Sequence, residues 1–192
     1  MSLFPTFDLK ELPPRERILL TAHKLFYGYG IRATGIDRVI AESGVAKVTF
    51  YRHFPSKDEL IQAYLSYRHE MWMGWFTDAL RRHSKQHPGI GALLPTLREW
   101  FDDDGFRGCA FINCVVELGV AQPEVIDIAR MHKERMTDAI AVLLPESEAD
   151  TPDAHAVALA IDGAIVQAQY LQSADAALMS LERLLPSIRP AV

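Results

Sequence analysis

Apolar side chains recur three and four positions apart along most of the 192-residue chain. In the first such segment, which Pro13-Pro14 opens and Gly28 and Gly30 end, they are Ile18, Ala22, Leu25, Phe26 and Tyr29. This spacing lines one face of an α-helix, whereas a half-buried strand would alternate apolar and polar residues. No convincing alternation occurs, so the pattern predicts an all-α fold.

The next two helices are short and lie close together. The second begins at Thr34, where Asp37 three residues on resembles a capping box, and it ends at Ser43-Gly44. The third covers Lys47–His53, because the residue before Pro55 is disfavoured in a helix.

The rest of the chain is expected to be helical as well. Ser56 caps a long fourth helix that runs to about Gln86. Turn residues separate further helices over residues 90–102, 108–119, 123–144, 151–172 and 175–187. The total is about nine helices.

Composition favours an intracellular protein that folds without cross-links. Apolar residues make up 49% of the chain, which supports a core without disulfides or metal. The two cysteines, Cys109 and Cys114, form no disulfide framework and suit a reducing compartment. Neither a signal pattern nor a transmembrane stretch is found. The sequence therefore predicts a soluble, cytoplasmic protein with no membrane partner.

Charge is distributed unevenly. Residues 1–65 hold nine basic and seven acidic side chains, whereas residues 66–192 hold eleven basic and eighteen acidic ones. The net charge of −5 therefore comes from the second part of the chain. Nucleic-acid binding is compatible with the first part only.

Residues 36–54 have the pattern of a helix-turn-helix, with Gly44 at the position that needs left-handed backbone. Arg52 on the third helix can bond a guanine edge, and Val48 can touch a thymine methyl group. Lysine, threonine and tyrosine suit phosphate oxygens, and Lys57 can hold a further phosphate. The outward side chains of the third helix are Lys47, Val48, Thr49, Tyr51, Arg52 and His53. Any small helical bundle also exposes a mixed polar face, so the pattern alone leaves both interpretations open.

Three groups of residues occur together within residues 15–65. They are Ala22-x-x-Leu25-Phe26-x-x-x-Gly30, Thr34-x-Ile36-x-x-Val39/Ile40-Ala41-x-x-Gly44-Val45, and Lys47-x-Thr49-Phe50-Tyr51-x-His53-Phe54-Pro55-Ser56-Lys57-Asp58-Glu59-Leu60. This combination closely resembles the DNA-binding head of the tetracycline-repressor (TetR) family. The resemblance implies a three-helix DNA-binding domain over residues 1–55 and a helical ligand-binding and dimerisation domain over residues 56–192.

The same resemblance implies a function. The chain would be a repressor that binds a near-palindromic double-stranded operator as a homodimer and is released by a small molecule. Val48 and Arg52 would face bases, and the phosphate contacts would be Thr34, Lys47, Thr49, Tyr51, His53 and Lys57. Two positions depart from the pattern: Ala46 lacks the hydroxyl that often caps the recognition helix, and Val48 replaces a commonly small residue.

Residues of the second domain suggest a ligand site and an interface. An apolar, aromatic-rich region with a few polar anchors is typical of a small-molecule site, although the same aromatics can be core. Its candidates are Trp72, Trp75, Phe76, Trp100, Phe111, Asn113, Glu117, Gln167 and Tyr170. Small and apolar residues suit a dimer interface, although an intrachain core can use the same pattern. Those candidates are Val157, Ile161, Ala164, Ile165, Ala168, Leu178, Leu181 and Leu185.

No catalytic motif, cofactor fingerprint or metal-ligand spacing is found, so no catalytic residue, cofactor or metal site is expected. A helical enzyme or carrier for a small hydrophobic molecule is the alternative from another class. An activator or a corepressor-dependent regulator is also compatible with these residues.

Overall fold

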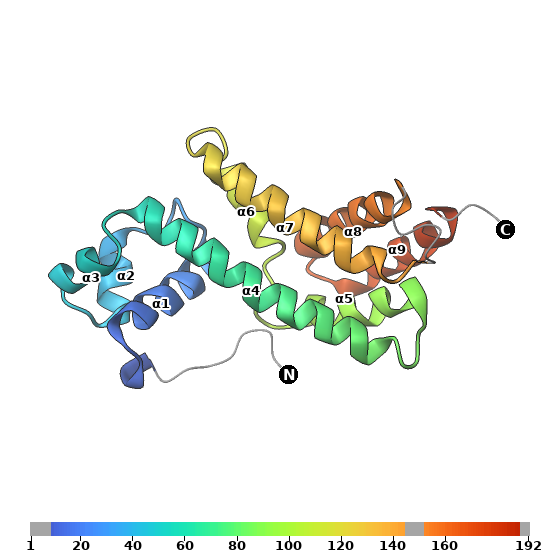
Figure 1. Cartoon of the computed structure of the whole chain (residues 1–192), viewed down its shortest axis with the longest axis horizontal. Helices are drawn as coiled ribbons and strands as arrows, with labels where there is room; N and C mark the ends of the chain where they lie inside the picture. Colours follow the sequence, from blue (N-terminus) through green and yellow to red (C-terminus); the bar gives the residue numbers. More distant parts are fainter. Residues whose placement is uncertain (1–8, 145–151, 189–192) are drawn as a thin grey trace. The chain divides into compact units, whose positions relative to one another are not determined.

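A computed structural model describes residues 9–144 and 152–188, and within these ranges the regular structure is entirely helical (Figure 1). The predicted all-α class is therefore confirmed. The described α-helices are α1 (Pro14–Tyr29), α2 (Ile36–Ser43), α3 (Lys47–His53), α4 (Lys57–His83), α5 (Leu93–Phe101), α6 (Ala110–Leu118), α7 (Pro123–Ala141), α8 (Pro152–Leu171) and α9 (Ala174–Ile188). Two short 3-10 helices, η1 (Leu9–Glu11) and η2 (Gly89–Ala92), precede α1 and α5. None of the described helices is both long and apolar enough to cross a membrane.

Most of the predicted helix ends lie within three residues of the observed ones. At the start of α2, however, the predicted N-cap is wrong. Thr34 does not cap this helix, because its buried hydroxyl donates a hydrogen bond backwards to the Gly30 carbonyl oxygen, 2.8 Å away. Gly35 is the N-cap instead and offers no side-chain cap. The capping box with Asp37 is therefore absent. At α4 the prediction is confirmed, since the Glu59 amide donates to the Ser56 hydroxyl (3.1 Å). The predicted first residue of the eighth helix, 151, lies outside the described residues.

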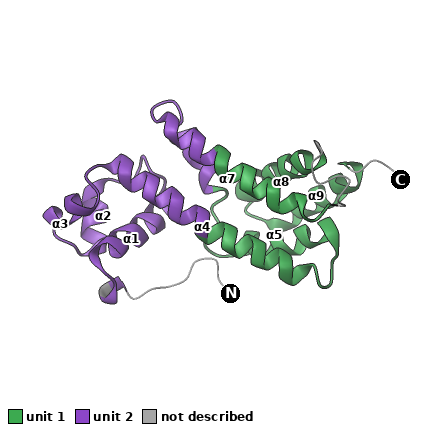
Figure 2. Cartoon of the chain, viewed as in Figure 1, with its two compact units in different colours: residues 1, 71–109, 130–192 green, residues 2–70, 110–129 purple. Residues whose placement is uncertain are grey.

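The chain divides into two compact units (Figure 2). The head unit contains the described residues 9–70 together with residues 110–129, and the body unit contains 71–109, 130–144 and 152–188. Helices α4 and α7 each continue from one unit into the other. The two units are defined by how the residues pack and do not test where one domain ends and the next begins. The domain boundary after residue 55 therefore stays a prediction.

Apolar side chains of α1, α3 and α4 form the core of the head unit, where Ile18, Phe50 and Leu60 are fully buried. A buried polar pair lies among them. The Arg68 guanidinium donates to Nε2 of His23 (3.3 Å) and lies over the Tyr27 ring, 4.0 Å from its centroid. Because a guanidinium can only donate, Nε2 must be the unprotonated, accepting nitrogen. Burial, and then the Arg68 charge, lower the pKa of His23 to about 3.

The turn between α1 and α2, residues 30–35, is held from two sides. The Lys57 ammonium donates to the carbonyl oxygens of Ile31 (2.6 Å) and Thr34 (2.8 Å). From α6, the carboxylate of Glu117 accepts the backbone N–H of Arg32 (2.9 Å). Gly30 has φ +89° and ψ 152°, a conformation that is essentially restricted to glycine. A β-carbon there would also lie 3.3 Å from both Glu117 carboxylate oxygens.

Gly30→Ala should destabilise the chain, because the backbone conformation and the nearby carboxylate both oppose a side chain. We expect a loss of about 1–3 kcal/mol in the free energy of unfolding, measured by urea denaturation. Gly28→Ala is the matched control. Gly28 lies in α1 with open space around its Cα, so alanine should stabilise by about 0.5–1 kcal/mol. Equal effects of the two substitutions would contradict this account of the turn.

The buried pair predicts acid sensitivity. Below pH 6.5 the unfolded chain binds a proton at His23, which the folded chain takes up only near pH 3. Unfolding should therefore become easier as the pH falls through this window, by up to about 1.4 kcal/mol per pH unit, with no contribution above it. Urea denaturation between pH 7 and pH 4 measures the slope. His23→Gln should flatten it, whereas substitution of the exposed His155 should not; an unchanged slope in His23→Gln would refute the assignment.

Candidate nucleic-acid interface

Helices α2 and α3 meet at a turn that α1 fixes. Gly44 has φ +65° and ends α2 in the left-handed conformation that the sequence predicted. The Arg17 side chain donates to the carbonyl oxygens of Ser43 (3.0 Å) and Gly44 (2.9 Å). Val39 and Phe50 are fully buried on the inner faces of the two short helices. The outward face of α3 is thus set by contacts with the rest of the head unit.

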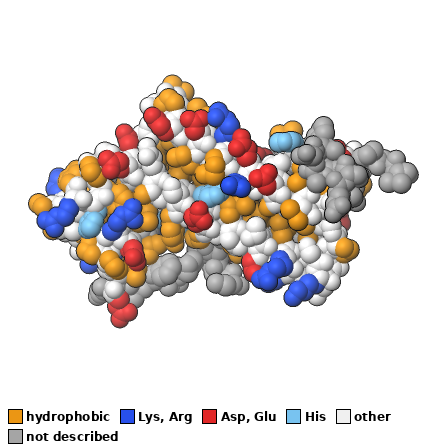
Figure 3. Space-filling model, viewed as in Figure 1, with side chains coloured by type: hydrophobic (Ala, Val, Ile, Leu, Met, Phe, Trp, Pro, Cys, Tyr) orange, Lys and Arg blue, Asp and Glu red, His pale blue; other side chains and the backbone are white. Residues whose placement is uncertain are grey.

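The predicted α3 residues share that outward face to different degrees. Val48 is 72% exposed and Tyr51 is 41% exposed. Lys47 and Arg52 are also exposed, whereas Thr49 and His53 are half-buried. Figure 3 shows Lys, Arg and His side chains gathered at the end of the head unit that Figure 1 labels α3.

Two local features shape this face. Lys47 Nζ lies 3.4 Å from an Asp37 carboxylate oxygen, and because both side chains are largely exposed the pair contributes little. Ala46 is the N-cap of α3 and provides no side-chain hydrogen bond, as the sequence indicated. The first N–H groups of α3 therefore lack an internal side-chain acceptor at the cap, which leaves room for an external one.

Two predicted phosphate contacts have structural roles. Thr34 is fully buried and its hydroxyl is bonded to Gly30, so it does not present a donor to DNA. Lys57 is half-buried, with two of its three donors used by carbonyl oxygens. Burial lowers the pKa of Lys57, and the nearby Glu117 and Asp58 carboxylates partly offset this. A phosphate contact for Lys57 stays a prediction that rests on its remaining N–H.

The predicted ligand residues are divided between the two units. Trp72, Trp75, Phe76, Trp100, Gln167 and Tyr170 belong to the body unit, and Phe111, Asn113 and Glu117 belong to the head unit. Glu117 has a structural role, because its carboxylate accepts the backbone N–H of Arg32 in the α1–α2 turn, and a ligand contact for it stays a prediction. Tyr170 is 67% exposed and therefore lines no enclosed site within its unit.

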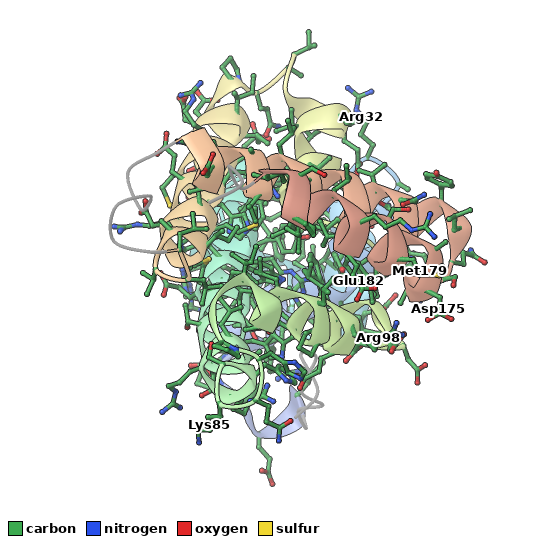
Figure 4. The ribbon with its side chains drawn as sticks, turned by 90° about the vertical axis from the view of Figure 1, so that its right-hand side faces the viewer. Arg32, Lys85, Arg98, Asp175, Met179 and Glu182 are labelled. Atoms are coloured by element: carbon green, nitrogen blue, oxygen red, sulfur yellow. The ribbon has the colours of Figure 1, made fainter. Side chains whose placement is uncertain are left out.

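The predicted dimer residues form a core within one chain. All eight are at most 5% exposed, because α8 and α9 pack against each other inside the body unit. Helix α9 also contacts α5, where the Arg98 guanidinium donates to the Asp175 carboxylate (2.9 Å; both residues are labelled in Figure 4). A second stripe on α8, which was not predicted from the sequence, is exposed and has the spacing i, i+4, i+7 and i+11: Leu159, Gly163, Val166 and Tyr170.

The chain shares its first part with a known family. Residues 18–64 match the family described as bacterial regulatory proteins, tetR family. These residues include α2, α3 and the turn between them. The match therefore covers the helix-turn-helix predicted from the sequence.

Individual proteins extend the similarity. The chain is 28% identical over 128 residues to the HTH-type transcriptional activator FasR of Mycolicibacterium smegmatis. The aligned residues make up 66% of this chain and 56% of FasR, so the chain spans about half of that protein. The crystal structure of SCO4454, a TetR-family regulator from Streptomyces coelicolor, superposes with a TM-score of 0.78 at 28% identity, covering 98% and 99% of the two chains. The multidrug binding protein EbrR, complexed with malachite green, shares the fold with a TM-score of 0.64 at 23% identity, covering 92% and 98%.

The head geometry, the family match and the superposition agree with one another. Residues 18–64 of the chain thus match the tetR family of bacterial regulatory proteins, and FasR and SCO4454, to which the chain is similar, are transcriptional regulators and not enzymes.

Proposed function

We propose that this chain is a ligand-responsive repressor that binds a near-palindromic operator as a homodimer and is released by a small molecule. The observation that carries the proposal is the exposed face of α3, where Lys47, Val48, Tyr51 and Arg52 project from a turn fixed by Arg17. On this helix Arg52 contacts a guanine edge and Val48 a thymine methyl group. Lys47 and Tyr51 contact phosphates and set the register.

A homodimer supplies two such helices to successive major grooves, about one helical turn of DNA apart. The exposed α8 stripe supports this assembly. Leu159 is 74% exposed and Val166 43%, and Gly163 between them lets another helix approach closely. The interface is thus proposed on the outer face of α8, since the inner face is occupied by α9.

Release follows from a shift between two conformations. A ligand that binds the body more tightly in the conformation that does not match the operator draws the dimer away from DNA. The EbrR complex supports this part, because a protein with the same fold holds an organic dye. Binding is placed in the body unit, where Trp72, Phe76 and Trp100 are gathered.

An activator is the second candidate, and one observation favours it: FasR, the relative described above, is a transcriptional activator. The two functions share the DNA-binding face and differ in the sign of the effect on transcription. A reporter gene placed downstream of an operator that the protein binds separates the two functions, because a repressor lowers expression of the reporter and an activator raises it.

Substitutions on α3 test the DNA-binding face. Arg52→Ala should relax the preference at one base pair, at a cost of about 1–3 kcal/mol for the preferred sequence. Lys47→Ala should weaken binding to all sequences and reduce the log–log salt slope by about one unit. Fluorescence anisotropy with operators selected from random DNA measures both. Lys85→Ala, an exposed lysine of the body unit, is the control and should change neither. Unchanged affinity in both α3 variants would exclude this face.

A charge on the α8 stripe tests the homodimer. Leu159→Glu should convert the dimer to a monomer, because an unpaired carboxylate would be buried between the two copies. Sedimentation velocity measures the change. Val142→Glu is the matched control, since Val142 is 82% exposed just beyond α7 and should tolerate the charge. A wild-type chain that sediments as a monomer, or a Leu159→Glu variant that still sediments as a dimer, would reject this interface.

A further inference from the structure

Three buried hydrogen-bond donors of the body unit have no partner among the described residues. They are the indole N–H groups of Trp72 and Trp100 and the hydroxyl of Thr96. All three side chains are at most 3% exposed. Thr96 and Trp100 are four residues apart on α5, so they share one face of that helix. Buried polar groups are normally bonded, and each exception calls for a physical explanation.

These donors are embedded in a continuous group of rings, which we call the aromatic cluster. The Trp72 ring stacks on Phe76, with 4.6 Å between the ring centroids. It also makes edge-to-face contacts with Trp100 and with His132, at 5.2 Å between centroids in each case. Trp100 in turn contacts Phe106 (5.4 Å). The cluster draws its side chains from α4, α5, α7 and the segment between α5 and α6.

The unpaired groups define the chemistry of the missing partner. An indole N–H donates and never accepts, so only an acceptor atom can satisfy Trp72 and Trp100. An ammonium group on the ligand could not satisfy these side chains, because it also donates hydrogen bonds and accepts none. Aromatic faces, in contrast, favour offset stacking or edge contacts with another flat ring. A carbonyl or ether oxygen on a flat ring system meets both conditions.

We propose that the body unit binds a neutral, planar aromatic molecule that carries a hydrogen-bond acceptor. The ring system lies against the aromatic cluster, and the acceptor is bonded by the Trp72 and Trp100 indoles and the Thr96 hydroxyl. This inference rests on the proposed function, because it names the chemical class of the molecule that releases the repressor.

A matched pair of probes tests the class. 9-Fluorenone and fluorene have the same tricyclic shape, and only fluorenone carries a carbonyl acceptor. Of the three tryptophans of the chain, Trp72 and Trp100 lie in the aromatic cluster and Trp75 adjoins both (6.2 and 6.4 Å between ring centroids), so quenching of tryptophan fluorescence reports binding there. We expect fluorenone to bind about five- to tenfold more tightly than fluorene for each hydrogen bond formed.

Conservative variants locate the acceptor. Trp72→Phe, Trp100→Phe and Thr96→Val each remove one donor and keep an apolar side chain of similar shape. Each should lower the fluorenone-to-fluorene affinity ratio, by up to the five- to tenfold contribution of one hydrogen bond. Trp75→Phe is the matched control: Trp75 is half-buried, its N–H is not among the three unpaired donors, and the ratio should stay at its wild-type value. Circular dichroism and urea denaturation verify that each variant is folded.

Three outcomes would overturn the inference. They are equal binding of the two probes, binding of neither, and a ratio that none of the three donor variants changes. The last would indicate that ordered water satisfies the donors. These titrations contain no DNA, so they are independent of operator binding. Selective fluorenone binding without operator recognition would reject the proposed function alone, and operator recognition without selectivity would reject this inference alone.

Discussion

The position of the recognition helix depends on a short turn that buries one large apolar side chain, Ile31, and is otherwise held by hydrogen bonds from charged groups. Residues 30–35 are held by the Lys57 ammonium, which bonds two carbonyl oxygens, and by the Glu117 carboxylate, which accepts a backbone N–H. Both are charge-assisted hydrogen bonds to backbone, which are stronger than neutral ones. Since α2 begins directly after this turn, these two side chains help to place α2, and the Arg17 hydrogen bonds at Ser43 and Gly44 extend that placement to α3.

Glu117 also explains why the head unit is not a continuous segment. It is 85 residues from Arg32 in the sequence, and it brings α6 and the first part of α7 into the same compact unit as α1–α3. A second contact, from the Gln122 amide to the Asp58 carboxylate (2.6 Å), fastens the same segment to the start of α4. Helix α7 then continues into the body unit. The chain therefore links its two units through helices, and a DNA-binding domain cut after residue 55 would lack both contacts.

Local chemistry determines what the sequence could predict. The fold class, the left-handed Gly44, the Ser56 cap and the uncapped start of α3 all depend on a few neighbouring residues, and these predictions are confirmed. Thr34 was misassigned because a threonine hydroxyl can bond backwards to a carbonyl as well as forwards to a helix N-terminus. The role of Glu117 depends on a partner far away in sequence. The α8 and α9 residues show a third limit: an apolar stripe looks the same whether a helix of the same chain or of a second copy covers it.

The inner faces of α8 and α9 cover each other within one chain, and this packing affects how operator occupancy depends on the concentration of the protein. Because this core is completed within one chain, a homodimer under the proposed function would join two already folded bodies. Under the proposed function, dimer concentration at low expression then rises with the square of protomer concentration. Occupancy of an operator would respond to small changes in the amount of this protein more steeply than a monomeric binder could.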